Sequence, residues 1–413
     1  MDITVRRSIV SGDIAAPVSI PMAHRALAAA SLSPVGQSVI SNLPDTPEIK
    51  ATISACNSFG ADIVLDGGVA DVFGAEELFA PKSVDCTGSG ATLRLFLPLA
   101  ALLDRGVQFN GNLPSKVSLE PFCAYLESLG AQCAGTLGKL PIKVQGPLQE
   151  TEMVYLPRFG TGLFSGMLLS FPLREIDSEM GIDGKFVRSE IVDATLSLMG
   201  KCGLEAHFEL ENVLMVPGGQ SFEPLGDYAV PGSPYLSSFF ILAGALAGKV
   251  RVQGTGESAP LKRMFSSFKA QASFSEGAMS SSAGSLFSAG LDSESLGAYL
   301  PHALLLSSVA EGESSFAGFS SLKGALGRTA RIMARELGRM GAVVREEEGT
   351  LFVKGGSLAG AEIEPDGDAA AAMCCSVAAL CAKGPSRIKG AECILARHPH
   401  FIRDMARLGA IMR

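Results

Sequence analysis

The chain has 413 residues, of which 47% are hydrophobic and 18% are charged, so it can bury a large core and is not an intrinsically disordered protein. Its formal net charge of −8 argues against nucleic acid as a general partner, because a surface that follows phosphates is usually basic. Residues 1–10 lack a secretory signal pattern, and no apolar run approaches the roughly 18 residues of a membrane span, so we expect a soluble, cytoplasmic protein with no membrane partner.

In chain order, six segments are predicted to form helices that are apolar on nearly every face. They alternate with amphipathic segments such as the helix expected from Thr46, where Ile49, Ile53 and Cys56 share one face. A helix that is apolar all round has to be buried, whereas an amphipathic helix belongs at a surface. The six buried helices begin near Pro21, Gly88, Gly160, Ser233, Ala298 and Gly367.

The amphipathic helices are predicted to end in a common signature, an apolar residue followed in most cases by glycine and alanine, before the chain turns into a strand. The central residues of these signatures are 66 to 73 positions apart, which indicates six repeats of about 70 residues. Three repeats could close around a bundle of buried helices, so six repeats predict two α/β domains. The central residues are Gly60, Gly130, Gly203, Lys269, Gly341 and Gly409.

The segment from Ser273 to Gly297 is rich in serine, glycine and alanine and carries little charge. It is either a flexible insertion or a weak hairpin, and its periodicity does not decide between the two.

The turn that opens the second buried helix is a candidate anion site. Gly88 and Gly90 let a ligand approach the backbone, Thr87 or Ser89 can cap the helix, and Arg94 adds a positive charge. The first turn of a helix also leaves N–H groups unpaired at the positive end of the helix dipole. An ordinary capped helix start is the alternative.

The nine cysteines include no CxxC pair and mostly lie in apolar stretches, which favours buried free thiols over disulfides or a zinc site. His398 and His400 are two positions apart and so do not share a helical face. We therefore expect no metal.

Several motifs resemble those of the 5-enolpyruvylshikimate-3-phosphate synthase family, and the resemblance extends over essentially the whole chain. The pattern PGSKS, then Asn or His, then Arg-Ala is matched in part by Pro17, Ser19, His24, Arg25 and Ala26. The pattern N-[SA]-G-T-x-x-R is matched in part by Gly88, Ser89, Gly90, Ala91 and Arg94. Other similar stretches are SEIVDATLSLM from Ser189, VPGSPYLSSFFILA from Val230, the residues around Pro301, ELGRMGA from Glu336, and Asp368 with Met373.

The resemblance implies the enolpyruvyl transferase fold, with two pseudo-threefold domains and a ligand cleft between them. The expected domains are residues 1–15 together with 231–413, and the inserted residues 16–230. The implied activity transfers the enolpyruvyl (carboxyvinyl) group of phosphoenolpyruvate to a phosphorylated alcohol, shikimate 3-phosphate, and releases phosphate. It needs no metal or organic cofactor, and its partners are small anionic substrates. We also expect a monomer.

The resemblance places the substrate-binding groups on matched positions. The main candidates are Arg25, Ser89, Gly90, Arg94, Thr161 and Arg188, with Lys116, Arg328, Asp368 and Arg397 as weaker ones. Arg158, Lys323 and Arg331 are further cations near anion-binding positions of the family.

The chain differs from the family motifs at positions where the motifs have polar, charged or catalytic residues. The base aspartate is replaced by Ala298, and the lysine–glutamate pair by Ala325 and Leu326. Ile20, Gly88, Gly160, Gly162, Thr329, Ala369, Ala370 and Ala396 also replace polar or charged residues of the motifs. Catalytic residues therefore stay unassigned and activity stays open. The alternatives are an impaired or inactive paralogue that binds an anionic ligand or a partner, and a transferase with another acceptor.

Overall fold

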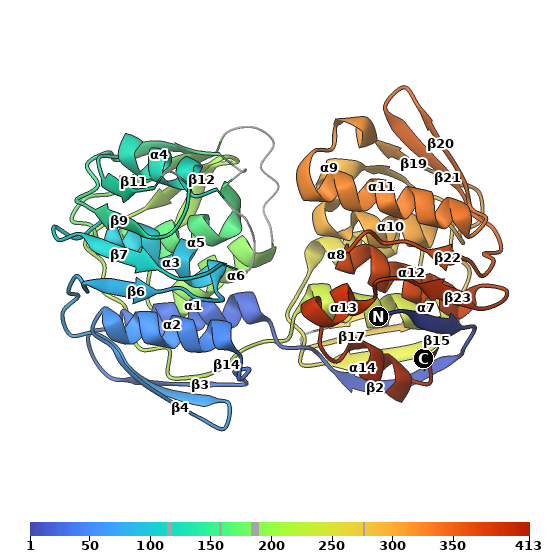
Figure 1. Cartoon of the computed structure of the whole chain (residues 1–413), viewed down its shortest axis with the longest axis horizontal. Coiled ribbons are helices and arrows are strands. Elements are labelled where there is room, and N and C mark those ends of the chain that lie inside the picture. The colour runs from blue at the N-terminus through green and yellow to red at the C-terminus, as the bar shows by residue number, and fades with distance from the viewer. Residues whose placement is uncertain (114–117, 137, 157–158, 183–189, 276) are drawn as a thin grey trace. The chain divides into compact units, whose positions relative to one another are not determined.

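The computed structural model describes residues 1–413 except 114–117, 137, 157–158, 183–189 and 276 (Figure 1). The chain forms two compact units: unit 1 holds residues 1–17 and 232–413, and unit 2 holds residues 18–231. Each unit has its own hydrophobic core.

The described residues form six four-stranded sheets, three in each unit, and all six have the same arrangement. In each sheet the first two strands are parallel and the two following pairs are antiparallel. This sixfold recurrence confirms the predicted repeats.

The sheets of unit 2, each in spatial order, are β14 (Asp227–Ala229), β3 (Gln37–Ser41), β5 (Val69–Phe73) and β4 (Asp62–Asp66); β6 (Ser83–Asp85), β7 (Val107–Asn110), β9 (Ile142–Gln145) and β8 (Gln132–Gly135); and β10 (Glu152–Tyr155), β11 (Ser178–Ile182), β13 (Val213–Val216) and β12 (His207–Leu210). Those of unit 1 are β2 (Val10–Ala15), β15 (Gly248–Gln253), β17 (Ala278–Ser282) and β16 (Ala272–Ser275); β18 (Gly290–Asp292), β19 (Glu313–Ala317), β21 (Thr350–Lys354) and β20 (Val343–Glu347); and β22 (Glu362–Ile363), β23 (Ser386–Ile388), β1 (Ile3–Arg6) and β24 (Ile411–Met412).

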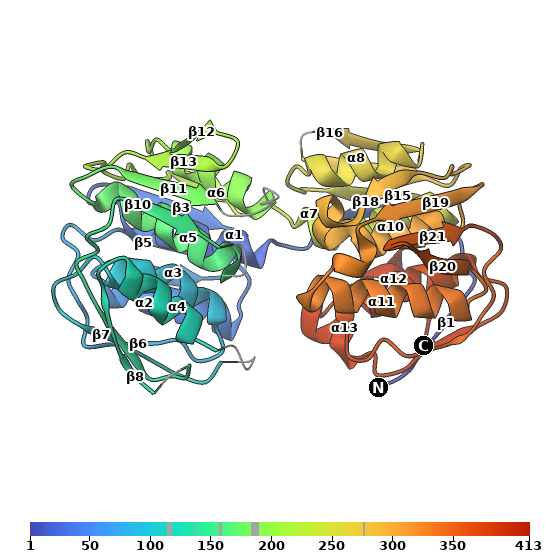
Figure 2. The ribbon, with the colours of Figure 1, turned by 90° about the horizontal axis from the view of Figure 1, so that it is seen from above.

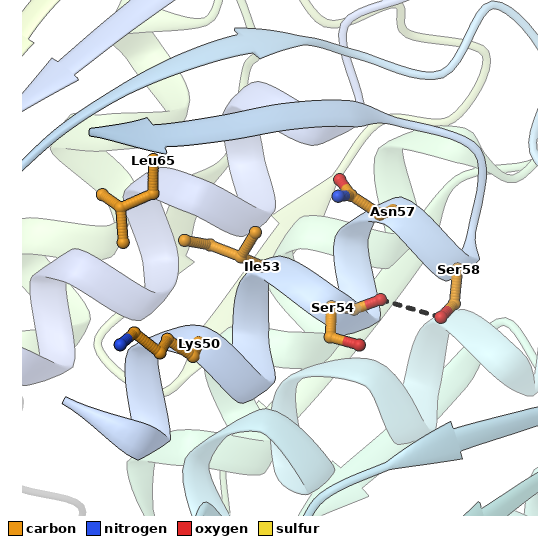
Figure 3. A pocket seen from close by; sticks show the side chains of 6 residues that line it. All are labelled: Lys50, Ile53, Ser54, Asn57, Ser58 and Leu65. Atoms are coloured by element: carbon orange, nitrogen blue, oxygen red, sulfur yellow. Dashed lines mark hydrogen bonds between the residues drawn. The ribbon is translucent and has the colours of Figure 1, made fainter. Parts of the chain in front are cut away.

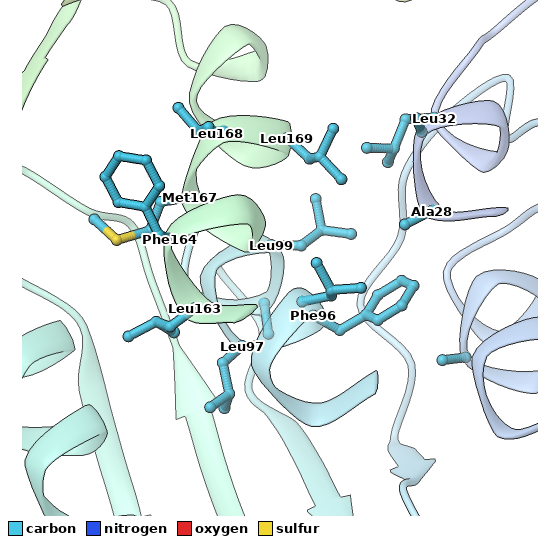
Figure 4. Packing of buried hydrophobic residues seen from close by; sticks show 14 of the residues in the cluster. Ala28, Leu32, Phe96, Leu97, Leu99, Leu163, Phe164, Met167, Leu168 and Leu169 are labelled. Carbon is cyan, nitrogen blue, oxygen red and sulfur yellow. The ribbon is translucent and has the colours of Figure 1, made fainter. Parts of the chain in front are cut away.

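The six apolar helices are buried, as predicted, and sheets and amphipathic helices surround them in each unit (Figures 1 and 2). In unit 2, leucines and phenylalanines of two of these helices interdigitate beside Ala28 and Leu32 (Figure 4). Close approach at this crossing depends on Gly166, where a Cβ atom would lie 2.6 Å from the carbonyl oxygen of Arg94. The buried helices are α1 (Ile20–Ser31), α3 (Gly90–Ala100), α5 (Gly160–Ser170), α7 (Pro234–Ala247), α10 (Leu300–Ser307) and α12 (Ala369–Cys381).

The amphipathic helices end where the signatures predict. Each signature centre lies two residues beyond its helix and has a positive φ, including Lys269 at 52°, the one signature centre that is not glycine. This left-handed residue satisfies the last helical carbonyls and turns the chain towards a strand. The helices are α2 (Pro47–Ser58), α4 (Glu120–Ser128), α6 (Glu190–Lys201), α8 (Ala259–Ser267), α11 (Gly324–Arg339) and α14 (Phe401–Arg407).

The segment 273–297 contains an antiparallel hairpin, because most of β16 and all of β17 fall within it and pair with each other. The hairpin alternative is therefore correct. The remaining short elements are η2 (Phe171–Leu173), α9 (Ser293–Leu296), η3 (Gly297–Tyr299), η4 (Phe319–Ser321) and α13 (Glu392–Arg397). Within the described ranges, none of the helices is both long and apolar enough to cross a membrane.

Candidate anion-binding site

In unit 2, Arg25 joins the beginnings of two buried helices. It lies on α1, is 3% exposed, and its Nε donates to Ser165 Oγ and Thr195 Oγ1, both at 3.0 Å. Nη1 donates to the carbonyl of Pro21 at 2.7 Å, and Nη2 donates to the carbonyl of Thr161 at 3.2 Å. The tip of the guanidinium is therefore held at the first turns of α1 and α5.

Arg25 is a buried cation whose recorded partners are all neutral. Burial lowers the pKa of its guanidinium to about 10, so it still carries its charge at neutral pH. No described carboxylate forms an ion pair with it. Each terminal nitrogen carries two N–H groups and has one described acceptor, so one N–H on each has no acceptor among the described residues.

Arg94 lies on α3 and packs against the first turn of α5. Its Nη1 donates to the carbonyl of Gly90 at 3.1 Å, and its stem packs on Gly162, where a Cβ atom would lie 3.1 Å from Arg94 Cδ. The guanidinium carbon is 5.8 Å from the ring centre of Phe122. Burial lowers the pKa of Arg94. Within the described residues this arginine also has no carboxylate partner, so two cations without a counter-ion stand near the N-termini of α1, α3 and α5.

The structure decides which residue caps α3. Ser89 is the N-cap, and its Oγ accepts a hydrogen bond from the backbone N of Thr92 at 3.1 Å. Thr87, the other candidate, instead donates its hydroxyl to Asp85 Oδ1 at 2.7 Å. Gly88 has a φ of 78°, and a Cβ atom there would meet nothing within 4 Å, so the turn is open beside the helix start.

The other described candidates lie in unit 1. Asp368 caps α12: its Oδ1 accepts from the backbone N of Ala371 at 3.0 Å, and its Oδ2 accepts from Thr329 Oγ1 at 2.5 Å. Arg328 Nη2 is 3.7 Å from Asp368 Oδ2. Arg397 ends α13, with its guanidinium carbon 5.6 Å from the ring centre of Tyr235.

Ala298, Ala325 and Leu326, which stand where the family pattern has charged groups, lie in η3 and in the first turn of α11. Lys116, Arg158 and Arg188 lie outside the described residues.

Several polar residues at these sites could not be assigned to a site from the sequence. His24, Thr52 and Thr92 are buried next to the α3 cap, and Tyr235 lies beneath Arg397. His24 was noticed only as a motif match. Thr52 and Thr92 carry no local signal, because they meet through packing of separate helices.

A surface groove on α2 is unrelated to these residues. Figure 3 shows it beside β4, lined by Lys50, Ile53, Ser54, Asn57, Ser58 and Leu65, and no predicted site residue contributes to it. The described residues also contain no group of three or more His, Cys, Asp or Glu side chains that could hold a metal ion. All nine cysteines are free thiols.

Comparison with solved structures identifies the class of fold. The enolpyruvyl transferase NikO from Streptomyces tendae aligns over 100% of this chain and 98% of its own, with a TM-score of 0.72 and 16% identity. An EPSP synthase from Acinetobacter baumannii aligns over 100% and 99% of the two chains, with a TM-score of 0.85 and 20% identity. The fold is therefore the enolpyruvyl transferase fold.

The family follows from sequence comparison. Residues 5–405 match the family model described as EPSP synthase (3-phosphoshikimate 1-carboxyvinyltransferase). The 3-phosphoshikimate 1-carboxyvinyltransferase of Methanothrix thermoacetophila is 30% identical over 426 aligned positions, covering 100% of this chain and 99% of the relative. The chain belongs to the EPSP synthase family, as its motifs predicted.

Proposed function

We propose that this chain transfers the enolpyruvyl group of phosphoenolpyruvate to shikimate 3-phosphate and releases phosphate. The observation that carries the proposal is a pair of arginines, Arg25 and Arg94, that have no carboxylate partner among the described residues and lie near three buried helix N-termini in a chain of this family. Two cations and unpaired N–H groups suit an anion such as a phosphate or a carboxylate.

Each described group has a role in binding under this proposal. Arg25 offers one N–H from each terminal nitrogen, Arg94 supplies a second charge, and Ser89 and Gly90 supply the cap and first turn of α3. Thr161 contributes through the carbonyl that holds Arg25. In unit 1, Arg328 and Arg397 are the corresponding cations, and the predicted ligand cleft between the units stays part of the proposal.

The chemistry proceeds by addition and elimination, and each step moves protons. In the addition, the acceptor hydroxyl oxygen bonds to the vinyl carbon of phosphoenolpyruvate, the hydroxyl proton passes to a base, and the methylene carbon gains a proton to become a methyl group. In the elimination, the methyl group loses a proton as the bond between carbon and the phosphate oxygen breaks and phosphate leaves. These steps need an acid and a base. We assign neither, because Ala298, Ala325 and Leu326 carry no ionisable group.

Phosphate release from phosphoenolpyruvate and shikimate 3-phosphate tests the proposal directly. We expect phosphate to appear only when both substrates are present, together with calorimetric binding of shikimate 3-phosphate alone. If saturating substrates release no phosphate from clean protein, the proposed reaction is wrong.

A second candidate is a binding protein derived from the enzyme, favoured by the three apolar replacements at the charged positions. It predicts that shikimate 3-phosphate or another anion raises the melting temperature without forming product. A third outcome, turnover with a different phosphorylated alcohol, would indicate a changed acceptor.

The remaining expectations are a monomer in the cytoplasm that binds small anions. Light scattering after size-exclusion chromatography tests the monomer, and the expected molar mass is that of one 42.9 kDa chain.

A further inference from the structure

Four buried polar side chains of unit 2 form a continuous chain that ends at the cap of α3. His24 Nδ1 lies 2.6 Å from Thr52 Oγ1, which lies 2.6 Å from Thr92 Oγ1, which lies 2.7 Å from Ser89 Oγ. The four residues come from α1, α2, α3 and the α3 cap, and each is at most 1% exposed. We call these four residues the polar chain.

The direction of its hydrogen bonds follows from counting protons, because a hydroxyl has one proton to donate. Thr92 donates to Ser89. In its 2.6 Å contact with Thr52, Thr92 must therefore accept, so Thr52 donates. Thr52 could alternatively donate to the carbonyl of Glu48, but that oxygen is 3.4 Å away, and the shorter contact would then join two oxygens without a proton.

The same count fixes the proton on the histidine. Thr52 has used its proton on Thr92, so at its 2.6 Å contact with His24 it must accept, and Nδ1 of His24 must carry a hydrogen. The other ring nitrogen, Nε2, is buried, has no hydrogen-bond partner among the described residues, and lies 3.6 Å from Glu48 Oε2. Each hydrogen bond of the polar chain is therefore donated in the same direction, from His24 to Thr52, from Thr52 to Thr92 and from Thr92 to Ser89.

At the far end, Ser89 is left with a proton and nothing in the described structure to receive it. Its oxygen already accepts two hydrogen bonds, from the backbone N of Thr92 at 3.1 Å and from the Thr92 hydroxyl at 2.7 Å. Both lone pairs are occupied, so Ser89 can act towards a ligand only as a donor. A buried hydroxyl proton without an acceptor is costly, which favours an acceptor that arrives with the ligand.

We propose that His24, Thr52 and Thr92 are positioning residues that hold Ser89 as an obligate hydrogen-bond donor to an anionic oxygen of the substrate at the N-terminus of α3. The inference rests on the proposed function and deepens it, because it specifies a phosphate or carboxylate oxygen as the ligand atom at this point. A ligand group that can only donate is rejected there.

The order of the protons is tested first, without any substrate. ¹⁵N chemical shifts of the imidazole nitrogens, assigned by comparison with His24→Asn, report which nitrogen carries hydrogen. We expect Nδ1 of His24 to be protonated in the wild-type chain and to lose that preference in Thr52→Val, which removes the acceptor. An unprotonated Nδ1 in the wild-type chain overturns the proposal.

A double-mutant cycle then tests the effect on the ligand. Thr92→Val removes the hydroxyl that orients Ser89, whereas Thr92→Ser keeps a hydroxyl and is the matched control. We expect Thr92→Val to weaken shikimate 3-phosphate binding by about 2- to 10-fold, the value of one hydrogen bond, and Thr92→Ser to bind like wild type. In a Ser89→Ala background, Thr92→Val should have no further effect on the Kd.

A merely structural role predicts a different result. If Thr92→Val lowers affinity equally in both backgrounds, or does not change it in either, the polar chain does not act through Ser89. A wild-type chain that fails to bind shikimate 3-phosphate contradicts the proposed function instead, and the proton on His24 then decides the direction of the polar chain by itself.

Discussion

At the scale of single residues, two buried arginines of unit 2, Arg174 and Arg25, have different surroundings. Arg174 is 6% exposed and donates to Ser178 Oγ at 2.7 Å and to the carbonyl of Glu150 at 2.9 Å. Arg25 is buried to a similar degree, but its terminal nitrogens donate to carbonyls in the first turns of α1 and α5. The side chains of Arg25 and Arg174 are therefore exposed to a similar, small degree, but their guanidinium groups have different neighbours.

This difference gives a prediction for anion binding. Arg25→Ala and Arg94→Ala should each raise the Kd for shikimate 3-phosphate by about 10- to 100-fold, because a hydrogen bond to a charged group contributes about 1.5–3 kcal/mol. Calorimetric titration measures the Kd. Arg174→Ala is the control: it should lower the melting temperature and leave the affinity of the folded protein unchanged. Normal binding by both Arg25→Ala and Arg94→Ala would show that the site lies elsewhere.

His302 in unit 1 makes stability depend on pH. It is fully buried, its Nε2 lies 2.7 Å from Ser238 Oγ, and burial lowers its pKa to about 3. Unfolding restores a pKa near 6.5, so the unfolded chain binds a proton that the folded chain excludes, and stability falls as pH drops below about 6.5. Burial also lowers the pKa of His398, to about 4, so both residues act in the same direction.

We therefore expect His302→Gln to weaken the acid sensitivity of the fold. Between pH 7.5 and pH 5, His302 should lower the free energy of unfolding by about 2 kcal/mol, and His398 should lower it by a similar amount. Urea unfolding at pH 7.5 and pH 5 should show a smaller loss of stability in His302→Gln than in wild type, by about 2 kcal/mol. Equal losses in the two proteins would contradict the assignment.

At the scale of elements, the crossing of α3 and α5 depends on one small residue. A Cβ atom at Gly166 would lie 2.6 Å from the carbonyl oxygen of Arg94 and 2.8 Å from that of Leu95. These atoms belong to the helix backbone and cannot rotate away, so a larger residue must push the two helices apart. Arg94 would move with α3, which couples this packing to the candidate site.

Gly166→Ala should accordingly destabilise unit 2 by about 1–3 kcal/mol, the usual result of overpacking a core. Gly200→Ala is the control, because it lies on the exposed face of α6 with nothing within 4 Å of a new Cβ atom. That change should stabilise the helix by about 0.5–1 kcal/mol. Denaturant unfolding measures both changes, and a neutral Gly166→Ala would mean that the helices separate without cost.

The elements could be predicted from the sequence because their signals are local. An all-apolar helix and a left-handed residue after a helix each occupy a few consecutive positions, and even Lys269 was found from its spacing. The polar chain could not be predicted, because Thr52 and Thr92 are 40 positions apart and meet only when α2 and α3 pack. The sequence also did not show whether Ser89 or Thr87 caps α3. Ser89 is the cap, and the Thr87 hydroxyl instead donates a hydrogen bond to Asp85.

At the scale of the whole molecule, unit 2 is formed by one continuous segment of the chain and unit 1 by two separate segments. The ends of unit 2 meet, since the backbone N of Ser19 donates to the carbonyl of Pro231 at 3.0 Å. Unit 1 needs the N-terminal residues, because β1 lies between β23 and β24 and is the only described strand that pairs with β24. β2 likewise pairs with β15.

This arrangement predicts that fragment 18–231 folds alone and that fragment 232–413 does not. Without residues 1–17, the sheet β22-β23-β1-β24 loses an inner strand and leaves two edges unpaired. β1 and β24 are antiparallel neighbours, and the backbone N of Arg413 donates to the carbonyl of Thr4 at 3.0 Å, so a short turn can join residue 413 to residue 1.

The permuted chain 232–413, turn, 1–17 should therefore fold where fragment 232–413 fails. Circular dichroism and thermal melting of the two fragments and the permuted chain measure the result, with cooperative melting expected for fragment 18–231 and for the permuted chain. The matched control carries residues 1–17 with Val5→Asp, which places a charge at a fully buried position of β1 and should abolish the rescue. Cooperative folding of fragment 232–413 by itself would show that the other strands of unit 1 close without β1.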